Sequence, residues 1–278
     1  MKKSSKVFLS ILLILSIVLT AGCSSKTSAG SASALENIKK AGVLKVGVKS
    51  DVPKFSMVDT ATNEYSGFED DLAYEIAAVI FDCTSTEAKE KKMVEFQGVT
   101  AKTRGPLLEN GEIDLVIATF TITEERKESY NFSTPYFTDA IGLLVKKNNN
   151  YTSITDLDGE AIGVAQSSTT KDSIDAYIAE NNMEITVTYS EYTSYPEIKA
   201  ALDSGRVKAF SVDGAILAGY IDDTTQLLPE KFSPQDYGIA SNLNNTDLAE
   251  LVNTSIINLR ESGKLNEMLT SWGLESYK

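Results

Sequence analysis

Charged and hydroxyl side chains gather in this chain where predicted strands end. The run 118–126 places threonine hydroxyls after a strand and ends at Arg126, whose planar guanidinium matches a carboxylate. Thr123 is suited to cap a short helix that holds Arg126. A surface ion pair with Glu124 or Glu125 is the alternative, and spacing alone does not decide between the two. This run is therefore a candidate carboxylate site.

Two other strand ends carry polar groups. Ser168 and Thr169 follow a predicted strand at 161–165 and open a helix, whose free N–H groups and positive dipole end favour an anion. The alternative is that one of the two hydroxyls simply caps this helix. Asp213 ends a buried strand, where a lone carboxylate suits an ammonium group or caps the following helix.

Two cations complete the set. Lys49 follows the predicted strand 43–48, and Arg104 lies in the turn that opens a predicted helix at 102–109. For both, the alternative is a solvated surface charge. The aromatic side chains considered as pocket lining are Phe55, Phe120, Tyr136 and Tyr195. Aromatic residues more often belong to the core.

These groups need a scaffold that brings strand ends together. From residue 35 onward, short β-rich runs alternate with runs of helical period. The predicted strands are 43–48, 93–96, 113–118, 161–165, 185–189 and 207–212, and the predicted helices are 69–81, 102–109, 169–180 and 195–204. Ser194 and Glu197 have the spacing of a capping box. The alternation predicts an α/β fold with parallel sheets covered on both faces, whose ligands bind outside the carboxyl ends of the strands.

Two segments share one pattern: a helix end, a glycine in the C′ position, one intervening residue and a buried strand. The glycines are Gly111 and Gly205, and the strands that follow lead to Thr119 and Asp213. Every αβ unit looks somewhat like this. The equivalence nevertheless places Thr119 and Asp213 at the same point of two separate units, and two lobes that face each other with such ends would enclose a crevice.

Composition excludes several kinds of site. The 278 residues include no histidine, so a Ser-His-Asp triad, a Cys-His pair and a His-ligated zinc are all excluded. Two cysteines cannot form a four-thiolate metal site or a disulfide framework. A net charge of −13 argues against nucleic acid as a partner. We expect neither a metal nor a cofactor.

The N-terminus has the pattern of an export signal. Three lysines within 1–6 precede an apolar run at 7–19 and small residues at 20–22, directly before Cys23. The apolar run is shorter than the roughly 20 residues of a membrane-spanning helix, although an uncleaved anchor is the alternative. The stretch 24–34 is small and polar, which is typical of a flexible tether.

The segment 19–23 resembles a bacterial lipobox, with Thr20 where leucine is preferred. The resemblance implies that residues 1–22 are a signal peptide, that cleavage occurs before Cys23, and that a lipid on its sulfur holds the chain to the bilayer at the outer face of the cell membrane. Residues 23–34 would then be the lipidated cysteine and its tether. Cys83 would be left alone, and no intrachain disulfide could form.

Several motifs resemble the polar amino-acid substrate-binding proteins of bacterial ABC importers, the extracellular solute-binding protein family 3. In order along the chain, they lie at 67–73, 118–127, 131–136 and 237–240. The stretches that resemble the aspartate/glutamate-binding branch lie at 47–53 and 101–108. The resemblance covers nearly everything from about residue 35 to 272.

The resemblance implies a two-lobed, type II periplasmic-binding-protein (venus-flytrap) fold. Its two interlobe crossings would fall near 136–140 and 233–237. Lobe 1 would comprise 35–138 and 238–278, and lobe 2 would comprise 139–237. The aromatic residue that many relatives stack on the ligand falls at Val52, and the segment 81–92 is longer than usual and has no functional account.

The resemblance also implies roles for individual residues. Arg126 and Thr121 would take an α-carboxylate together with the helix start at Ser168 and Thr169, and Asp213 and Thr119 would take an α-ammonium. The protein would be a monomeric, extracytoplasmic binding protein that closes on an amino acid and delivers it to ABC permease subunits, without catalysis.

Charge favours an acidic ligand. Lys49, Arg104 and Arg126 against Asp213 give the site a net +2, and unpaired desolvated charge is costly. Glutamate or aspartate is therefore expected, provided that all three cations point inward. The alternatives are a neutral polar amino acid such as glutamine or cystine, a dehydratase-like enzyme that uses Glu69 or Asp213 as its acid or base, and a sensor or adhesin on the same fold.

Overall fold

The computed structural model describes residues 33–277. The predicted signal peptide, the lipid on Cys23 and most of the predicted tether lie outside this range. The end of the tether prediction is wrong, because Ser33 caps helix α1 (Ala34–Ala41) and accepts a hydrogen bond from the backbone N–H of Glu36 at 3.2 Å. Within 33–277, no helix is long and apolar enough to cross a membrane.

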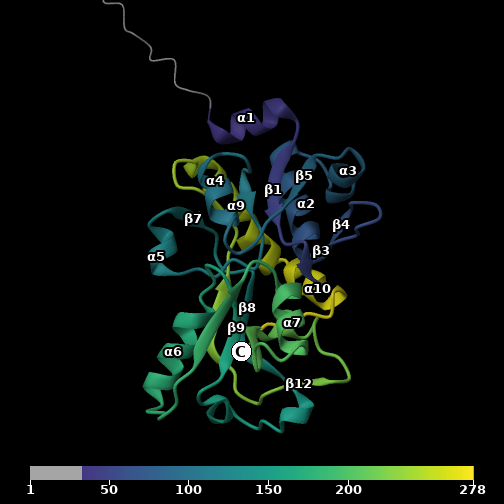
Figure 1. The fold of residues 1–278 in the computed structure, drawn as a ribbon. Helices are drawn as coiled ribbons and strands as arrows, with labels where there is room; N and C mark the ends of the chain where they lie inside the picture. Colours follow the sequence, from purple (N-terminus) through teal and green to yellow (C-terminus); the bar gives the residue numbers. More distant parts are fainter. Residues whose placement is uncertain (1–32, 278) are drawn as a thin grey trace, which may run out of the picture. The chain divides into compact units, whose positions relative to one another are not determined.

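The first half of the described chain, together with its last segment, forms one sheet and the helices around it, and this unit is here called lobe 1 (Figure 1). Its strands, in spatial order, are β5 (Val94–Gly98), β1 (Leu44–Val48), β6 (Leu115–Val116), β14 (Ala240–Asn242) and β7 (Tyr130–Phe132). A small neighbouring sheet contains β2 (Asp51–Val52), β3 (Ser56–Val58) and β4 (Tyr65–Ser66). The helices of lobe 1, besides α1, are α2 (Phe68–Phe81), α3 (Ser85–Glu90), α4 (Arg104–Glu109), α5 (Glu124–Lys127), α9 (Thr246–Glu261) and α10 (Lys264–Ser271).

The middle of the chain builds the second sheet, here called lobe 2. Its strands, in spatial order, are β10 (Thr188–Tyr192), β9 (Ala161–Ala165), β11 (Ala209–Asp213), β8 (Phe137–Lys146) and β12 (Thr225–Leu227), and β13 (Phe232–Tyr237) also pairs with β8. Its helices are α6 (Thr170–Glu180), α7 (Tyr195–Asp203) and α8 (Gly214–Leu217), with short 3-10 turns η1 (Lys147–Asn149) and η2 (Ile154–Leu157).

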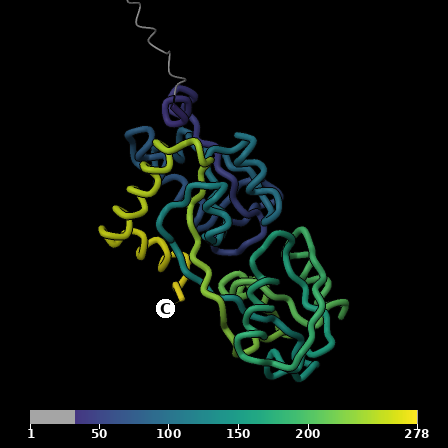
Figure 2. Tube along the Cα trace, turned by 90° about the vertical axis from the view of Figure 1, so that its left-hand side faces the viewer, coloured from purple at the N-terminus to yellow at the C-terminus, as the bar shows by residue number. Residues whose placement is uncertain are grey.

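Strands β8 and β13 lead between the two lobes, and Figure 2 shows both segments passing from one to the other. The strands are antiparallel, with Tyr237 opposite Phe137 and Gln235 opposite Asp139. The expectation of a two-lobed fold with two crossings is therefore confirmed. The boundaries at 138/139 and 237/238 stay a prediction.

The sheets are mixed rather than purely parallel, which corrects the sequence prediction. The pairs β1–β5, β1–β6, β9–β10 and β9–β11 are parallel, whereas β8 and β14 run antiparallel to their neighbours. The antiparallel pairing of β13 with β8 follows from the crossings, because a chain that returns from one lobe to the other runs against the strand that left. Strand β10 begins at Thr188, three residues later than the predicted 185.

The predicted pattern of a glycine directly after a helix, before a buried strand, is confirmed in both segments. Gly111 has φ 71° and Gly205 has φ 76°, the left-handed conformation of a C′ residue that favours glycine. The predicted capping box on α7 is wrong. The Ser194 hydroxyl makes no capping hydrogen bond, and the Glu197 carboxylate accepts from the N–H of Thr193 at 3.1 Å and from its hydroxyl at 2.8 Å.

Candidate ligand-binding site

Arg104 stands at the start of α4 and is almost completely buried, with 3% of its surface exposed. Its Nη1 donates to the carbonyl oxygens of Ala118 at 2.7 Å and Thr119 at 3.2 Å, and its guanidinium lies 4.1 Å from the centre of the Phe120 ring. Its Nε has no partner among the described residues. Burial lowers the pKa of Arg104, and Tyr195, Tyr136, Asp213 and Glu69 counteract that shift.

Thr119 follows β6 in a strained backbone conformation with φ 45°. Its N–H donates to Glu69 Oε1 at 2.6 Å, and its carbonyl accepts from Arg104. The hydroxyl Oγ1 is buried and unpartnered within the described chain. The turn at Thr119 is therefore fixed from both sides, which leaves its hydroxyl available.

Glu69 belongs to the first turn of α2 and is fully buried. Besides the N–H of Thr119, its Oε1 accepts a hydrogen bond from the Tyr136 hydroxyl at 2.5 Å. Burial raises the pKa of Glu69 to about 7, and the hydrogen bonds from Tyr136 and Thr119 and the charges of Arg104 and Lys49 oppose the rise. Sequence reasoning named Glu69 only as a candidate general base and missed its contact with Thr119.

Lys49 is 2% exposed and forms an ion pair with Asp51, with 3.0 Å between Nζ and Oδ1. Its Nζ also lies 4.6 Å from the centre of the Tyr195 ring, which belongs to α7 of lobe 2. Burial lowers the pKa of Lys49, Asp51 raises it again, and Arg104 adds to the lowering. The solvated-charge alternative is therefore wrong for both Lys49 and Arg104.

Arg126 is half-buried on α5, which Thr123 caps as expected by accepting from the N–H of Arg126 at 3.1 Å. Its Nη1 donates to the Thr121 carbonyl at 2.7 Å, and its Nη2 donates across to the Ser167 carbonyl of lobe 2 at 3.3 Å. Its guanidinium lies 4.7 Å from the centre of the Phe120 ring.

The surroundings of Arg126 decide against a simple surface pair. Glu124 instead binds Lys127 at 2.7 Å. Burial lowers the pKa of Arg126 to about 9, nearby Arg104 adds to the lowering, and Asp213 opposes it. The guanidiniums of Arg126 and Arg104 thus both lie against the Phe120 ring.

Asp213 is the last residue of β11 and is 5% exposed. It accepts a hydrogen bond from the hydroxyl of Tyr237, at the end of crossing strand β13. Burial raises the pKa of Asp213 to about 7, and neighbouring Asp139 raises it further, while Tyr237, Arg104 and Arg126 oppose the rise. Asp213 occupies the N-cap position of α8 but makes no capping bond, so the capping alternative is not realised.

The start of α6 faces Arg126 across the crevice. Ser168 Oγ donates to the Ala165 carbonyl at 2.8 Å, and Thr169 Oγ1 donates to Gln235 Oε1 at 2.7 Å. Neither hydroxyl caps the helix, which corrects the capping alternative. A cavity of about 550 Å³ separates α5 from α6, with Arg126 on one wall and Ser168 and Thr169 on the other.

The fold and this crevice can now be compared with known proteins. The family described as bacterial extracellular solute-binding proteins, family 3, matches residues 44–275. The chain belongs to this family.

Similar proteins include binding proteins of amino-acid transport. The chain is 35% identical over 277 residues to the ABC transporter glutamine-binding protein GlnH of Bacillus subtilis, covering 96% of this chain and 97% of that one. It is 38% identical over 250 residues to a glutamine-binding protein of Geobacillus stearothermophilus, covering 84% and 90%. The solved structure of an ancestral arginine-binding protein bound to arginine matches with a TM-score of 0.71 and 31% identity, covering 84% and 98%.

The aromatic residues predicted as pocket lining of this solute-binding protein differ in their surroundings. Phe55 is fully buried and packs its ring edge to face against Phe137 at 5.2 Å and Tyr237 at 5.9 Å, as a core residue does, and its assignment as pocket lining stays a prediction. Phe120 lies against the guanidiniums of Arg104 and Arg126, and Tyr195 lies against the ammonium of Lys49, so both contact predicted site residues and their place as pocket lining stays a prediction. The buried Tyr136 hydroxyl donates a hydrogen bond to Glu69.

The charge count of the crevice differs from the sequence expectation. Asp51 neutralises Lys49, and Glu69 adds a second carboxylate near Arg104. The net +2 therefore falls to +1 with Asp51 counted, and it reaches zero only when Glu69, whose pKa is about 7, is ionised. The electrostatic preference for an acidic ligand is therefore weaker than the sequence count implied.

Asp51 was missed by the sequence reasoning, although a signal existed. It lies only two residues after Lys49, close enough in the chain to form an ion pair.

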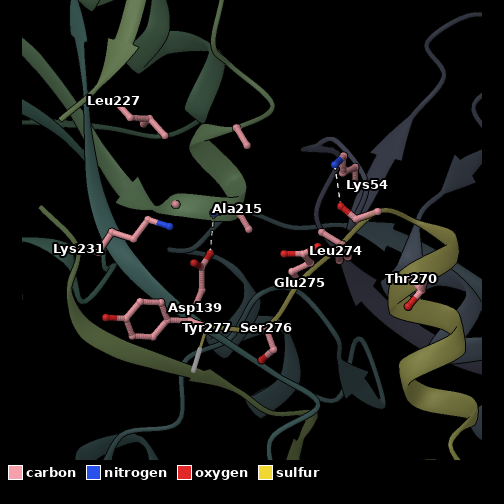
Figure 3. A pocket seen from close by; sticks show the side chains of 13 residues that line it. Lys54, Asp139, Ala215, Leu227, Lys231, Thr270, Leu274, Glu275, Ser276 and Tyr277 are labelled. Atoms are coloured by element: carbon pink, nitrogen blue, oxygen red, sulfur yellow. Dashed lines mark hydrogen bonds between the residues drawn. The ribbon is translucent and has the colours of Figure 1, made fainter. Parts of the chain in front are cut away.

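A second cavity of the solute-binding protein, of about 620 Å³, lies beside α8 and the C-terminal segment (Figure 3). Two of its charged groups make hydrogen bonds: Asp139 accepts from the N–H of Ala215 at 2.8 Å, and Lys54 Nζ donates to the Gly273 carbonyl at 2.8 Å. None of the predicted site residues lines it, whereas Arg126, Ser168 and Thr169 line the cavity between α5 and α6.

Proposed function

We propose that this protein binds a polar α-amino acid, glutamine foremost, between its lobes and delivers it to the membrane subunits of an ABC importer. The observation that carries the proposal is that Arg104 and Arg126 of lobe 1 lie against one ring, that of Phe120, and are electrostatic neighbours of Asp213 of lobe 2, with a cavity beside Arg126. Opposite charges held at two points of a crevice suit the carboxylate and ammonium of a zwitterion.

Each end of the ligand has suitable partners in this proposal. Arg126 and Thr121 of lobe 1, with the α6 start at Ser168 and Thr169, take the α-carboxylate. Asp213 takes the α-ammonium together with the free hydroxyl of Thr119. Because these groups belong to both lobes, a bound amino acid links the lobes and favours the form that the permease recognises.

The choice of glutamine rests on two supports. The pairing of Lys49 with Asp51 weakens the electrostatic preference for glutamate or aspartate. Two relatives at 35% and 38% identity are named for glutamine. Glutamate, aspartate, arginine and cystine are the competitors to be measured.

Isothermal titration calorimetry with these five amino acids tests the proposal. We expect glutamine to bind most tightly, and tighter binding of glutamate would contradict the choice of side chain. The variant Arg126→Ala should lose at least about a hundredfold in affinity while its melting temperature changes little. The matched control is Arg206→Ala, which removes an exposed arginine outside the crevice. Wild-type affinity in Arg126→Ala would sink the carboxylate assignment.

We further propose that the mature protein is a monomer anchored outside the cell membrane by a lipid on Cys23. The support is the export-signal pattern and the match to a family of extracellular proteins. The variant Cys23→Ala should pass from the membrane fraction to the culture medium. Retention on the membrane would contradict a lipid at this cysteine.

A further inference from the structure

Asp51 is connected to Arg126 through a series of neighbouring charged groups. The two guanidiniums of Arg126 and Arg104 contact the Phe120 ring, and Arg104 is in turn an electrostatic neighbour of Lys49. Lys49 pairs with Asp51 at 3.0 Å. These contacts form a series of neighbouring charged groups: Arg126, Arg104, Lys49 and Asp51.

The carboxylate of Asp51 is held in place by lobe 2. Its Oδ2 accepts from the N–H of Tyr195, the first residue of α7, at 3.2 Å. Its own carbonyl accepts a hydrogen bond from the Tyr220 hydroxyl. Asp51 is only 13% exposed and Lys49 only 2%, so their pair is shielded from water. A charge pair fixed in this way can discriminate between ligands, whereas a mobile surface pair cannot.

We propose that Asp51 is a specificity-determining residue, which selects an amide over a carboxylate at the end of the ligand side chain. The inference rests on the proposed function: if Arg126 binds the α-carboxylate, then the ligand side chain points toward Lys49 and Asp51. An amide offers an acceptor to Lys49 and a donor to Asp51, so both partners are satisfied. A carboxylate offers no donor, and its charge repels Asp51.

The test compares the affinity ratio of glutamine and glutamate in three proteins by calorimetry. Asp51→Asn leaves Lys49 unpaired, so we expect the ratio to shift toward glutamate by at least about tenfold. Asp223→Asn is the matched control, because it makes the same carboxylate-to-amide change at an exposed position. It should leave both affinities and their ratio unchanged.

A second variant keeps the test decisive if Asp51→Asn folds poorly. Lys49→Gln leaves the carboxylate of Asp51 without its cation, and the ratio should then move further toward glutamine. A ratio within about twofold of wild type in either folded variant would overturn the role of Asp51, while glutamine binding by the wild type would leave the proposed function standing. Wild-type protein that binds neither amino acid would overturn both.

Discussion

The two halves of the crevice hold their charged groups in different ways. In lobe 1, Arg104 and Glu69 are bonded to the backbone of one turn, since Arg104 donates to the carbonyl of Thr119 and Glu69 accepts from its N–H. In lobe 2, Asp213 is bonded to a single hydroxyl, that of Tyr237, and its pKa is raised to about 7. The charged groups Arg104 and Glu69 of lobe 1 thus stabilise the backbone turn at Thr119. The carboxylate of Asp213 in lobe 2 would instead gain from a cation beside it, because a cation would favour its ionised form.

The largest effect should come from breaking the lobe 1 arrangement. Glu69→Ala leaves the N–H of Thr119 and the hydroxyl of Tyr136 as buried, unpaired donors. We expect the free energy of unfolding to fall by about 3 kcal/mol, with weaker amino-acid binding. The measurement is urea denaturation followed by circular dichroism.

The control for this prediction lies on the same helix. Glu75→Ala removes a more superficial partner of Lys264 and should cost less than about 1 kcal/mol. Equal losses in the two variants would show that Glu69 contributes no more than an ordinary helix residue.

Breaking the lobe 2 side should separate binding from stability. Asp213→Asn is expected to lose at least about a hundredfold in amino-acid affinity, because the ammonium loses its charged partner. Its stability at pH 8 should be equal to or above that of wild type. The folded-state pKa of Asp213 is raised from 3.8 to about 7, so its contribution to stability is present below pH 3.8 and is lost as the pH rises through 7.

Calorimetry and thermal melts at pH 8 check both halves of that prediction. The exposed Asp223→Asn serves as the matched control and should change neither quantity. A large loss of stability in Asp213→Asn would mean that the two lobes hold their charges in the same way.

The raised pKa of Asp213 also predicts a smaller effect of pH on wild-type binding. An ammonium ligand requires the ionised carboxylate, so affinity should fall by about tenfold between pH 8 and pH 6, and binding should release protons. Titrations in buffers of different ionisation enthalpy measure this release. Because the pKa of Glu69 is also about 7, the variant Glu69→Gln is the control, and it should keep the same pH dependence of affinity. An affinity that does not change between pH 6 and 8 in wild type would contradict a raised pKa of Asp213.

The same contrast explains what the sequence could predict. Helical periodicity and the glycines Gly111 and Gly205 placed the elements and their strand ends, because these depend on local backbone preference. The partners of the charges were harder to predict. The contact of Glu69 with Thr119 spans 50 residues, and that of Asp213 with Tyr237 comes from a crossing strand. No local pattern records such contacts.

Asp51 marks the boundary between these two cases. Its nearness to Lys49 follows from their separation of only two residues and was available from the sequence. Its contact with the start of α7 required the second lobe. The acidic-ligand argument was weakened at this point, since it counted Lys49 as unpaired although its neutralising partner is two residues away.

The smallest expected difference is between helix caps in the two lobes. Thr123 of lobe 1 accepts from the N–H of Arg126 at 3.1 Å, whereas the Ser194 hydroxyl of lobe 2 makes no capping bond at α7. Thr123→Ala should therefore cost about 1 kcal/mol of unfolding free energy, and Ser194→Ala only a few tenths. Denaturation of both variants at one pH measures the two stability changes.

Because Thr123 also orients the helix that carries Arg126, its loss should weaken amino-acid binding, while the loss of the Ser194 hydroxyl should leave binding unchanged. Equal costs would mean that α5 takes its position from Arg126 and its contacts with lobe 2 rather than from its cap.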